Sequence, residues 1–237
     1  MKRNRNSNTY CIYLLFFCFA CFINAYSQPC QTAGVVFTET IGSVTATTTI
    51  ASHETANGFD NDSFTMSGTG DIRNTNMSSG YGAGNPTASG NGNAFLTNTV
   101  GRSFIISGIN SLGDGNLELA FGIYKSTNTG NGSNGSDLQI LLSTDGVNYS
   151  DTLTIAALPT GSGTTGWYYR KATGNIPRAA NLRIQFRQNG NITQYRIDDI
   201  KLSYGNTPVI QAGGNTIICN GNTVELSVSE ASSYLWS

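Results

Sequence analysis

A small set of carboxylates in this sequence has the residue types and the spacing to bind a cation. Asp198 and Asp199 are adjacent, Asp60 and Asp62 flank one asparagine, and Glu39 follows a short apolar run. Calcium is held by about six to eight oxygen atoms, which carboxylates, backbone carbonyls and water supply together. Clustered carboxylates without a cation would raise each other's pKa. We therefore predict a structural calcium site formed by Glu39, Asp60, Asp62 and Asp199, with Asp198 as the alternate ligand.

The adjacent aspartates lie within a strand-like segment, residues 194–203, whose apolar side chains break strict alternation. Ile197 and Ile200 are three residues apart, and Leu202 follows two residues later. Side chains on one face of a strand recur every second residue, so one extra residue is needed to keep these three on one side. A β-bulge at the two aspartates supplies it. We expect residues 35–40 to pair with this strand and to bring their glutamate beside it.

The remaining strand-like runs predict an all-β chain. Residues 117–124 and 182–188 alternate cleanly between apolar and polar side chains, which is typical of strands with one buried face. Further runs are residues 44–50, 64–72, 94–98, 102–109, 138–143, 151–156 and 167–172. We expect about ten strands, no helix, hairpins at 94–109 and 138–156, and an antiparallel two-sheet sandwich over roughly residues 33–204.

The first 27 residues are typical of a secretory signal peptide. A basic start precedes an apolar stretch at residues 11–23 and a small-x-small cleavage pattern at residues 25–27. The alternative is an uncleaved anchor, although the stretch is short for a span. Without this segment, ten basic residues remain against 14 acidic ones. A net charge of −4 with no basic cluster argues against nucleic-acid binding, and we expect no membrane span after cleavage.

The chain changes character after residue 204. Residues 205–208 are typical of a turn-rich linker, and residues 217–237 contain short strand-like runs with Cys219 and Trp236. A segment of this size cannot form a core alone. We therefore predict three parts, a signal peptide at 1–27, a sandwich domain at 28–205, and a linker with the start of a second β-sandwich at 206–237. Cys219 is expected to pair with a cysteine outside this sequence, and Cys30 is the alternative partner.

The sequence resembles a known group of modules. The run from the Val35-Val-Phe-Thr-Glu segment, through the Ser143-Thr-Asp-Gly turn, to Tyr195-Arg-Ile-Asp-Asp-Ile is similar to the jelly-roll modules of secreted Bacteroidetes proteins, which are related to galactose-binding-like carbohydrate-binding modules. Residues 217–237 resemble the start of the PKD/Ig-like repeats found in substrates of type IX secretion. The resemblance implies a jelly-roll β-sandwich followed by a truncated Ig-like/PKD-like one. It also implies that Glu39 and Asp199 hold a structural calcium.

Aromatic side chains and the side chains of arginine and glutamine are the candidates for ligand contact. Aromatic faces stack on sugar rings, and arginine or glutamine hydrogen-bonds hydroxyl groups. The alternative for the tryptophan is a place in the core. These candidates are Tyr81, Trp167, Tyr169, Arg183, Gln185 and Arg187.

No catalytic site is predicted. His53 is the single histidine, no serine lies in a Gly-x-Ser-x-Gly elbow, and His53 is expected to be a solvated loop residue. We therefore predict a non-catalytic extracellular or cell-surface binding module that recognises a glycan or another surface component. Two alternatives remain open, namely the accessory N-terminal region of a secreted hydrolase and a spacer domain of an adhesin. Glycoside hydrolysis by a pair of carboxylates is a further alternative.

Overall fold

The computed structural model describes residues 33–126, 132–205, 210–213 and 225–228. The main body consists of β1 (Gly34–Glu39), β2 (Thr48–Thr49), α1 (Ile50–Thr55), β3 (Thr65–Gly68), β4 (Asp71–Arg73), β5 (Asn93–Leu96), β6 (Ser103–Ile109), β7 (Leu117–Lys125), β8 (Leu138–Ser143), β9 (Asp151–Ile155), β10 (Gly166–Thr173), β11 (Leu182–Gln188) and β12 (Tyr195–Tyr204). A separate antiparallel pair consists of β13 (Ile210–Gly213) and β14 (Glu225–Val228).

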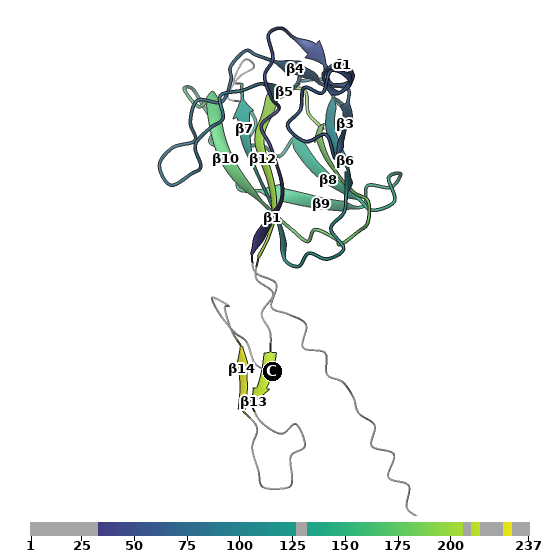
Figure 1. Cartoon of the computed structure of the whole chain (residues 1–237). Coiled ribbons are helices and arrows are strands. Elements are labelled where there is room, and N and C mark those ends of the chain that lie inside the picture. Colours follow the sequence, from purple (N-terminus) through teal and green to yellow (C-terminus); the bar gives the residue numbers. More distant parts are fainter. Residues whose placement is uncertain (1–32, 127–131, 206–209, 214–224, 229–237) are drawn as a thin grey trace, which may run out of the picture.

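The strands of the main body form two layers (Figure 1). One layer contains β2, β4, β5, β12, β7 and β10 in that order, with β1 also paired to β12, and the other contains β9, β8, β11, β6 and β3. The layers are joined where Ala172 and Thr173, at the end of β10, pair with β9. All the described pairings are antiparallel. The predicted antiparallel β-sandwich is confirmed.

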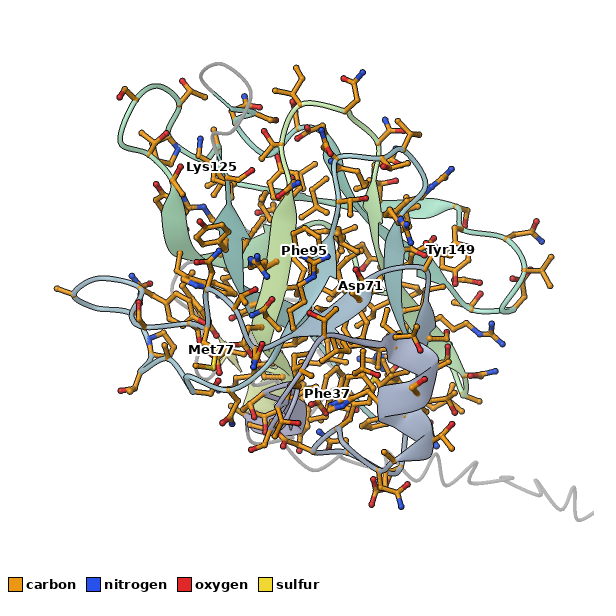
Figure 2. All side chains as sticks on the ribbon, turned by 90° about the horizontal axis from the view of Figure 1, so that it is seen from above. Phe37, Asp71, Met77, Phe95, Lys125 and Tyr149 are labelled. Carbon is orange, nitrogen blue, oxygen red and sulfur yellow. The ribbon has the colours of Figure 1, made fainter. Side chains whose placement is uncertain are left out.

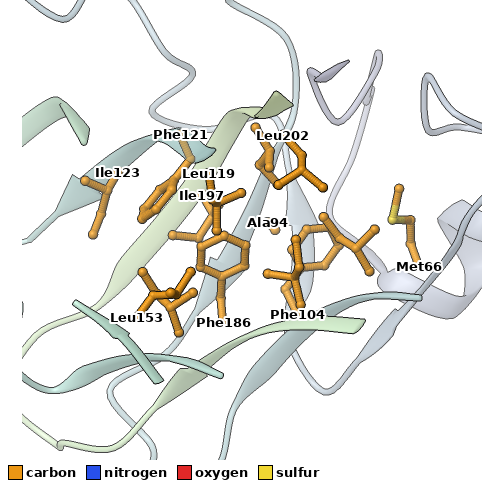
Figure 3. Close-up of a cluster of buried hydrophobic side chains, with 14 of the residues drawn as sticks. Met66, Ala94, Phe104, Leu119, Phe121, Ile123, Leu153, Phe186, Ile197 and Leu202 are labelled. Atoms are coloured by element: carbon orange, nitrogen blue, oxygen red, sulfur yellow. The ribbon is translucent and has the colours of Figure 1, made fainter. Parts of the chain in front are cut away.

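Apolar side chains from both layers meet between them, as Figure 3 shows. On β11, Leu182, Ile184 and Phe186 are buried and the residues between them are half-buried, as the alternation predicts. The ring of Phe186 meets the ring of Phe121 on β7 edge to face, with 4.9 Å between centroids. Each strand therefore turns one face to the core and one outward, and the outward faces are where a ligand could bind.

The bulge predicted in β12 is confirmed. The register with β7 shifts between Asp198 and Lys201, and Asp199 has a positive φ of 48°. As a result Ile197 and Ile200 are both fully buried. Along its other edge, β12 pairs first with β5 and then with β1. The bulge lies at the junction of these two neighbours, and the predicted pairing of residues 35–40 with this strand is also confirmed.

Several local predictions are wrong. Residues 64–72 form two strands, β3 and β4, in different layers. Residues 94–109 are not a hairpin, because β5 pairs with β4 and β12 while β6 pairs with β3 and β11 in the other layer. The chain crosses between layers in each case, which alternation within a single strand cannot reveal. The hairpin of β8 and β9 is confirmed.

The segment around residue 50 is a short helix rather than a strand end or a loop. Thr49 caps it, because its side-chain oxygen accepts a hydrogen bond from the backbone N–H of Ser52. This cap outweighs the strand preference of the threonines before it. The helix contacts β3 and β4, and therefore covers the open side of the sandwich between the two layers.

Other predictions fall outside the described residues. These are the signal peptide at 1–27, Cys30, Cys219 and most of residues 206–237, from which only β13 and β14 are described. The three-part domain division therefore stays a prediction. Within the described ranges, no helix has the length and apolar character to cross a membrane.

Candidate functional site

A row of large side chains crosses the outward face of the β5, β12, β7 and β10 strands. The register places Phe95 opposite Arg196, Arg196 opposite Tyr124, and Tyr124 opposite Trp167. Their sequence neighbours, such as Ile197 and Ile123, point into the core. Because adjacent side chains of a strand point to opposite faces, all four members of the row point away from the core.

Two further tyrosines extend this row into an aromatic patch, which we define as Tyr81, Tyr124, Trp167 and Tyr169. The ring of Trp167 lies 5.7 Å from that of Tyr124 and 6.2 Å from that of Tyr81, while Tyr81 lies 5.4 Å from Tyr169, all between centroids. The rings of Tyr124, Trp167 and Tyr169 are half-buried, so part of each reaches solvent. The patch combines apolar ring faces with hydroxyl and indole N–H groups.

A glycine makes room for Tyr81, which comes from the loop between β4 and β5. Gly122 lies on β7 directly opposite Tyr169, and a Cβ placed there would lie 2.1 Å from the Tyr81 hydroxyl oxygen. No side chain fits in that space. Gly122 therefore forms the recess into which the loop inserts its tyrosine.

The bulge of β12 holds this loop in place. The Tyr81 hydroxyl and the Ser89 backbone N–H both donate to Asp199 Oδ2, the latter at 3.1 Å. Ser89 Oγ also donates to Asp198 Oδ2 at 3.3 Å, and Trp167 Nε1 donates to the Asn76 carbonyl oxygen at 3.0 Å. The loop is thus fastened at both the bulge and the patch.

Burial changes the acidity of the groups at the bulge. The side chain of Asp198 is fully buried, and burial, with the adjacent charge of Asp199, raises the pKa of Asp198 to about 8. Burial and the same neighbouring carboxylate raise the pKa of the Tyr81 hydroxyl, which therefore stays a donor at neutral pH. The geometry favours a structural clamp, in which the two aspartates accept hydrogen bonds from the loop.

Two arginines lie at the other end of the row, and we call Arg73 and Arg196 the arginine pair. Both guanidinium groups lie over the ring of Phe95, with Cζ at 3.6 Å and 4.6 Å from its centroid. Figure 2 labels Phe95 and Asp71, which are opposite each other on β5 and β4. Arg73 Nη2 donates to Asp71 at 3.0 Å, and burial, together with the charge of Arg73, lowers the pKa of Arg196 to about 10.

The structure divides the predicted ligand residues between two faces. Tyr81, Trp167 and Tyr169 come together in the aromatic patch, and Trp167 is half-buried on the outward face rather than a core residue. The other three lie on β11 in the opposite layer and form no group with the first three; they are Arg183, Gln185 and Arg187.

Three members of the row and the adjoining Arg73 were not predicted. Tyr124, Phe95, Arg196 and Arg73 come from strands far apart in the sequence, and only the register brings them together. The alternation of residues 117–124 does place Tyr124 on the polar side of its strand. That signal, an aromatic residue at an outward position, could have identified Tyr124.

The predicted metal ligands take up structural hydrogen bonds. Glu39 is fully buried, and its two oxygens accept from the backbone N–H groups of Ile41, Asp60 and Asn61 at 2.8, 3.1 and 3.2 Å and from Asn61 Nδ2 at 3.1 Å. A carboxylate has about four lone-pair positions, so these donors fill them. A cation at Glu39 would have to displace at least one donor.

The other predicted ligands are only partly close to Glu39. Asp60 Oδ2 accepts from the Thr40 backbone N–H at 2.8 Å, whereas Asp62 is exposed. Glu39 and Asp199 line one pocket of about 240 Å³. Within the described ranges, no three His, Cys, Asp or Glu residues are arranged to hold a metal ion. The calcium site stays a prediction.

The single histidine has a structural position, and the expectation of a solvated loop residue is wrong. His53 lies on α1 and is 6% exposed. Its Nε2 is 2.8 Å from the Ile41 carbonyl oxygen, and its ring meets that of Phe59 edge to face at 4.6 Å. These contacts fix the ring against the segment after β1.

A larger pocket, of about 610 Å³, lies at the other ends of β7 and β10 and contains the ion pair of Lys171 with Glu118. No aromatic ring lines it. The pocket offers space and charged groups but no aromatic ring for stacking, which the aromatic patch does offer.

No protein-family profile and no curated protein matches the chain. The solved structures that are similar to it include the following three. The CBM22-1 xylan-binding domain of Paenibacillus barcinonensis Xyn10C has a TM-score of 0.45 and 8% identity, covering 75% of this chain and 98% of that one. TmCBM61, solved with β-1,4-galactotriose, has a TM-score of 0.35 and 16% identity, covering 59% and 86%. A carbohydrate esterase of the Shiga toxin-encoding bacteriophage phi24B has a TM-score of 0.38 and 12% identity, covering 73% and 99%. Because these TM-scores are below 0.5, the fold is assigned from the strand pairing described above and not from these structures.

Proposed function

We propose that this chain is a non-catalytic, glycan-binding module of an extracellular protein, and that it binds sugar on the aromatic patch. The observation that carries the proposal is the direct cross-strand pairing of Tyr124 with Trp167 on an outward face, with Tyr81 and Tyr169 against it. Aromatic side chains that gather on an outward face, rather than being scattered singly, indicate a contact surface. Their apolar faces suit the C–H faces of sugar rings.

The polar groups around the patch suit hydroxyl recognition. Arg196 lies between Phe95 and Tyr124, and its Nη1 donates to Asn93 Oδ1 at 2.9 Å. The neighbouring Arg73 side chain is 28% exposed, and its guanidinium group and the tyrosine hydroxyls offer hydrogen bonds beside the ring faces. The groups that might otherwise suggest catalysis, His53 and Glu39, are held by contacts inside the fold.

Binding can be measured by affinity electrophoresis and calorimetry against a panel of soluble plant, algal and bacterial polysaccharides. Trp167→Ala should weaken binding about tenfold or more, and the double variant with Tyr124→Ala should weaken it further, because each ring supplies stacking area. The control is Arg183→Ala with Arg187→Ala on β11, which should bind normally. Loss of binding in the control, with the tryptophan variant unchanged, would place the site on the opposite layer. Absence of binding to every polysaccharide would refute the proposed function.

A further inference from the structure

The arginine pair carries more positive charge than its surroundings balance. Both guanidinium groups lie on the same Phe95 ring, and Arg73 makes an ion pair with Asp71 at 3.0 Å. Within the described part of the chain, no carboxylate lies within ion-pair distance of Arg196. The arginine pair therefore has two positive charges and a single ion-pair partner within the described residues.

The uncompensated charge is buried. Arg196 is 6% exposed, and its Nε, like that of Arg73, is buried without a hydrogen-bond partner. Charged groups out of water are costly unless they are paired and hydrogen-bonded, and unpartnered donors add to that cost. The guanidinium group of Arg196 interacts with Arg73, Tyr124, Asn93 and Phe95. None of these four residues is an acidic residue.

Packing on aromatic rings accounts for the position of Arg196 but not for its charge. Its Cζ lies 4.6 Å from the Phe95 centroid and 5.7 Å from the Tyr124 centroid. Such stacking holds a guanidinium plane in a fixed orientation. An arginine that is already oriented loses little entropy when an anion binds.

Arg73 is the accessible member of the pair. Its side chain is 28% exposed and that of Asp71 is 30% exposed. Ion pairs at this exposure are weak, so an incoming anion can compete with Asp71 for the guanidinium. Behind it, Arg196 adds a second positive charge in a partly desolvated setting, where its attraction is less screened.

We propose that the glycan bound by this module is acidic, with a carboxylate or sulfate ester held at the arginine pair while the adjoining sugar lies on Tyr124 and Trp167. This inference rests on the proposed function. Neighbouring strands are about 4.8 Å apart, so Arg196 lies roughly 10 Å from Trp167, two strands away. The charged group and the stacked sugar therefore belong to neighbouring residues of one glycan.

The test uses polysaccharides in matched pairs that share a backbone and differ in charge. They are polygalacturonate and its methyl ester, glucuronoxylan and unsubstituted xylan, and a sulfated and an unsulfated galactan. The protein should bind the charged member of at least one pair about tenfold or more tightly, because charge-assisted hydrogen bonds to arginine are the strong ones. The preference should shrink at high salt. Comparison of the uronic acid pairs with the galactan pair identifies carboxylate or sulfate as the group bound.

Arg73→Gln and Arg196→Gln should each reduce this preference severalfold, while Trp167→Ala should weaken binding to both members of a pair. Arg73 is half-buried, so its variant remains informative if Arg196→Gln lowers the melting temperature. Equal binding of charged and neutral members, lost in Trp167→Ala, would overturn the inference and leave the proposed function intact. An acidic preference unchanged in both glutamine variants would also overturn it. Absence of binding to every polymer would refute the proposed function itself.

Discussion

The outward face of β7, β10 and β12 can be compared with the outward face of β11 in the other layer. Both carry outward polar side chains that include arginine, namely Arg196 on β12 and Arg183 and Arg187 on β11. On the first face, the register puts Arg196 between Phe95 and Tyr124. On the second, it puts Gln185 between Ile105 and Leu141, with no aromatic ring beside it. The comparison teaches that alternation identifies an outward residue, whereas its neighbours across the sheet decide what it can bind.

The largest expected effect comes from filling the recess under Tyr81. Gly122→Leu should expel Tyr81, remove much of the glycan binding and destabilise the fold by about 3 kcal/mol, the upper range for overpacking. Urea unfolding and calorimetric titration measure the two effects. Gly113→Ala is the control, because nothing lies within 4 Å of the added Cβ. Normal binding by Gly122→Leu would show that the Tyr81 loop does not contribute to the site.

The predicted calcium site gives the second effect and belongs to the same face, through Asp199. At a calcium concentration 100 times Kd, binding to the native state alone adds about 2.7 kcal/mol to the free energy of unfolding. The melting temperature should therefore rise with calcium and fall with EDTA, and Asp199→Ala should abolish the response. Asp198→Ala should do less. A melting temperature that is insensitive to EDTA would contradict the site and leave the carboxylates with the hydrogen bonds described above.

A smaller effect should distinguish the loop clamp from an ordinary tyrosine contact. Tyr81→Phe removes a hydroxyl that donates to the Asp199 carboxylate, and should cost about 2 kcal/mol. Tyr168→Phe removes a hydroxyl that donates to the neutral Thr164 carbonyl oxygen at 2.8 Å, and should cost about 1 kcal/mol. Denaturant unfolding of both variants measures the difference. Equal losses would indicate that the charge of Asp199 does not strengthen the clamp.

The smallest effect is expected in the other layer, at the turn between β8 and β9. Backbone N–H groups of Asn148 and Val147 donate to Asp145 and hold the pKa of its carboxyl below the ordinary value. Because the folded-state pKa is lowered, this stabilisation is present at neutral pH and is lost as pH falls below about 4. The melting-temperature difference between wild type and Asp145→Asn should therefore narrow from pH 7 to pH 3. Glycan binding should not change.

Much of the fold was predictable because its cause is local. The alternation in β7 and β11 and the broken phase around Ile197 and Ile200 are properties of single strands. The crossings between layers after β3 and β5 were not predictable in this way, because each crossing depends on which sheet offers a free edge. The cap at Thr49 was a readable signal, but the surrounding threonines favoured a strand.

The site was predictable only in part. Tyr81, Trp167 and Tyr169 could be chosen by residue type. The two-residue spacing places Trp167 and Tyr169 on one face of their strand, but nothing in the sequence places Tyr81 beside them. The recess at Gly122 and the stacking of Arg73 and Arg196 on Phe95 depend on contacts between distant segments. A glycine at an outward strand position is the one local hint of such a recess.

The bulge in β12 also has a consequence for the order in which this molecule can fold. The hydrogen bond from Tyr81 to Asp199 joins residues 118 positions apart, and β1 pairs with the same strand through Glu39 and Ile200. Contacts that close such long loops form slowly, because chain entropy is lost before they are gained. During synthesis, the loop that completes the aromatic patch lacks its anchor on Asp199 until β12 has emerged. The binding face should therefore be the last region to acquire slow amide exchange during refolding.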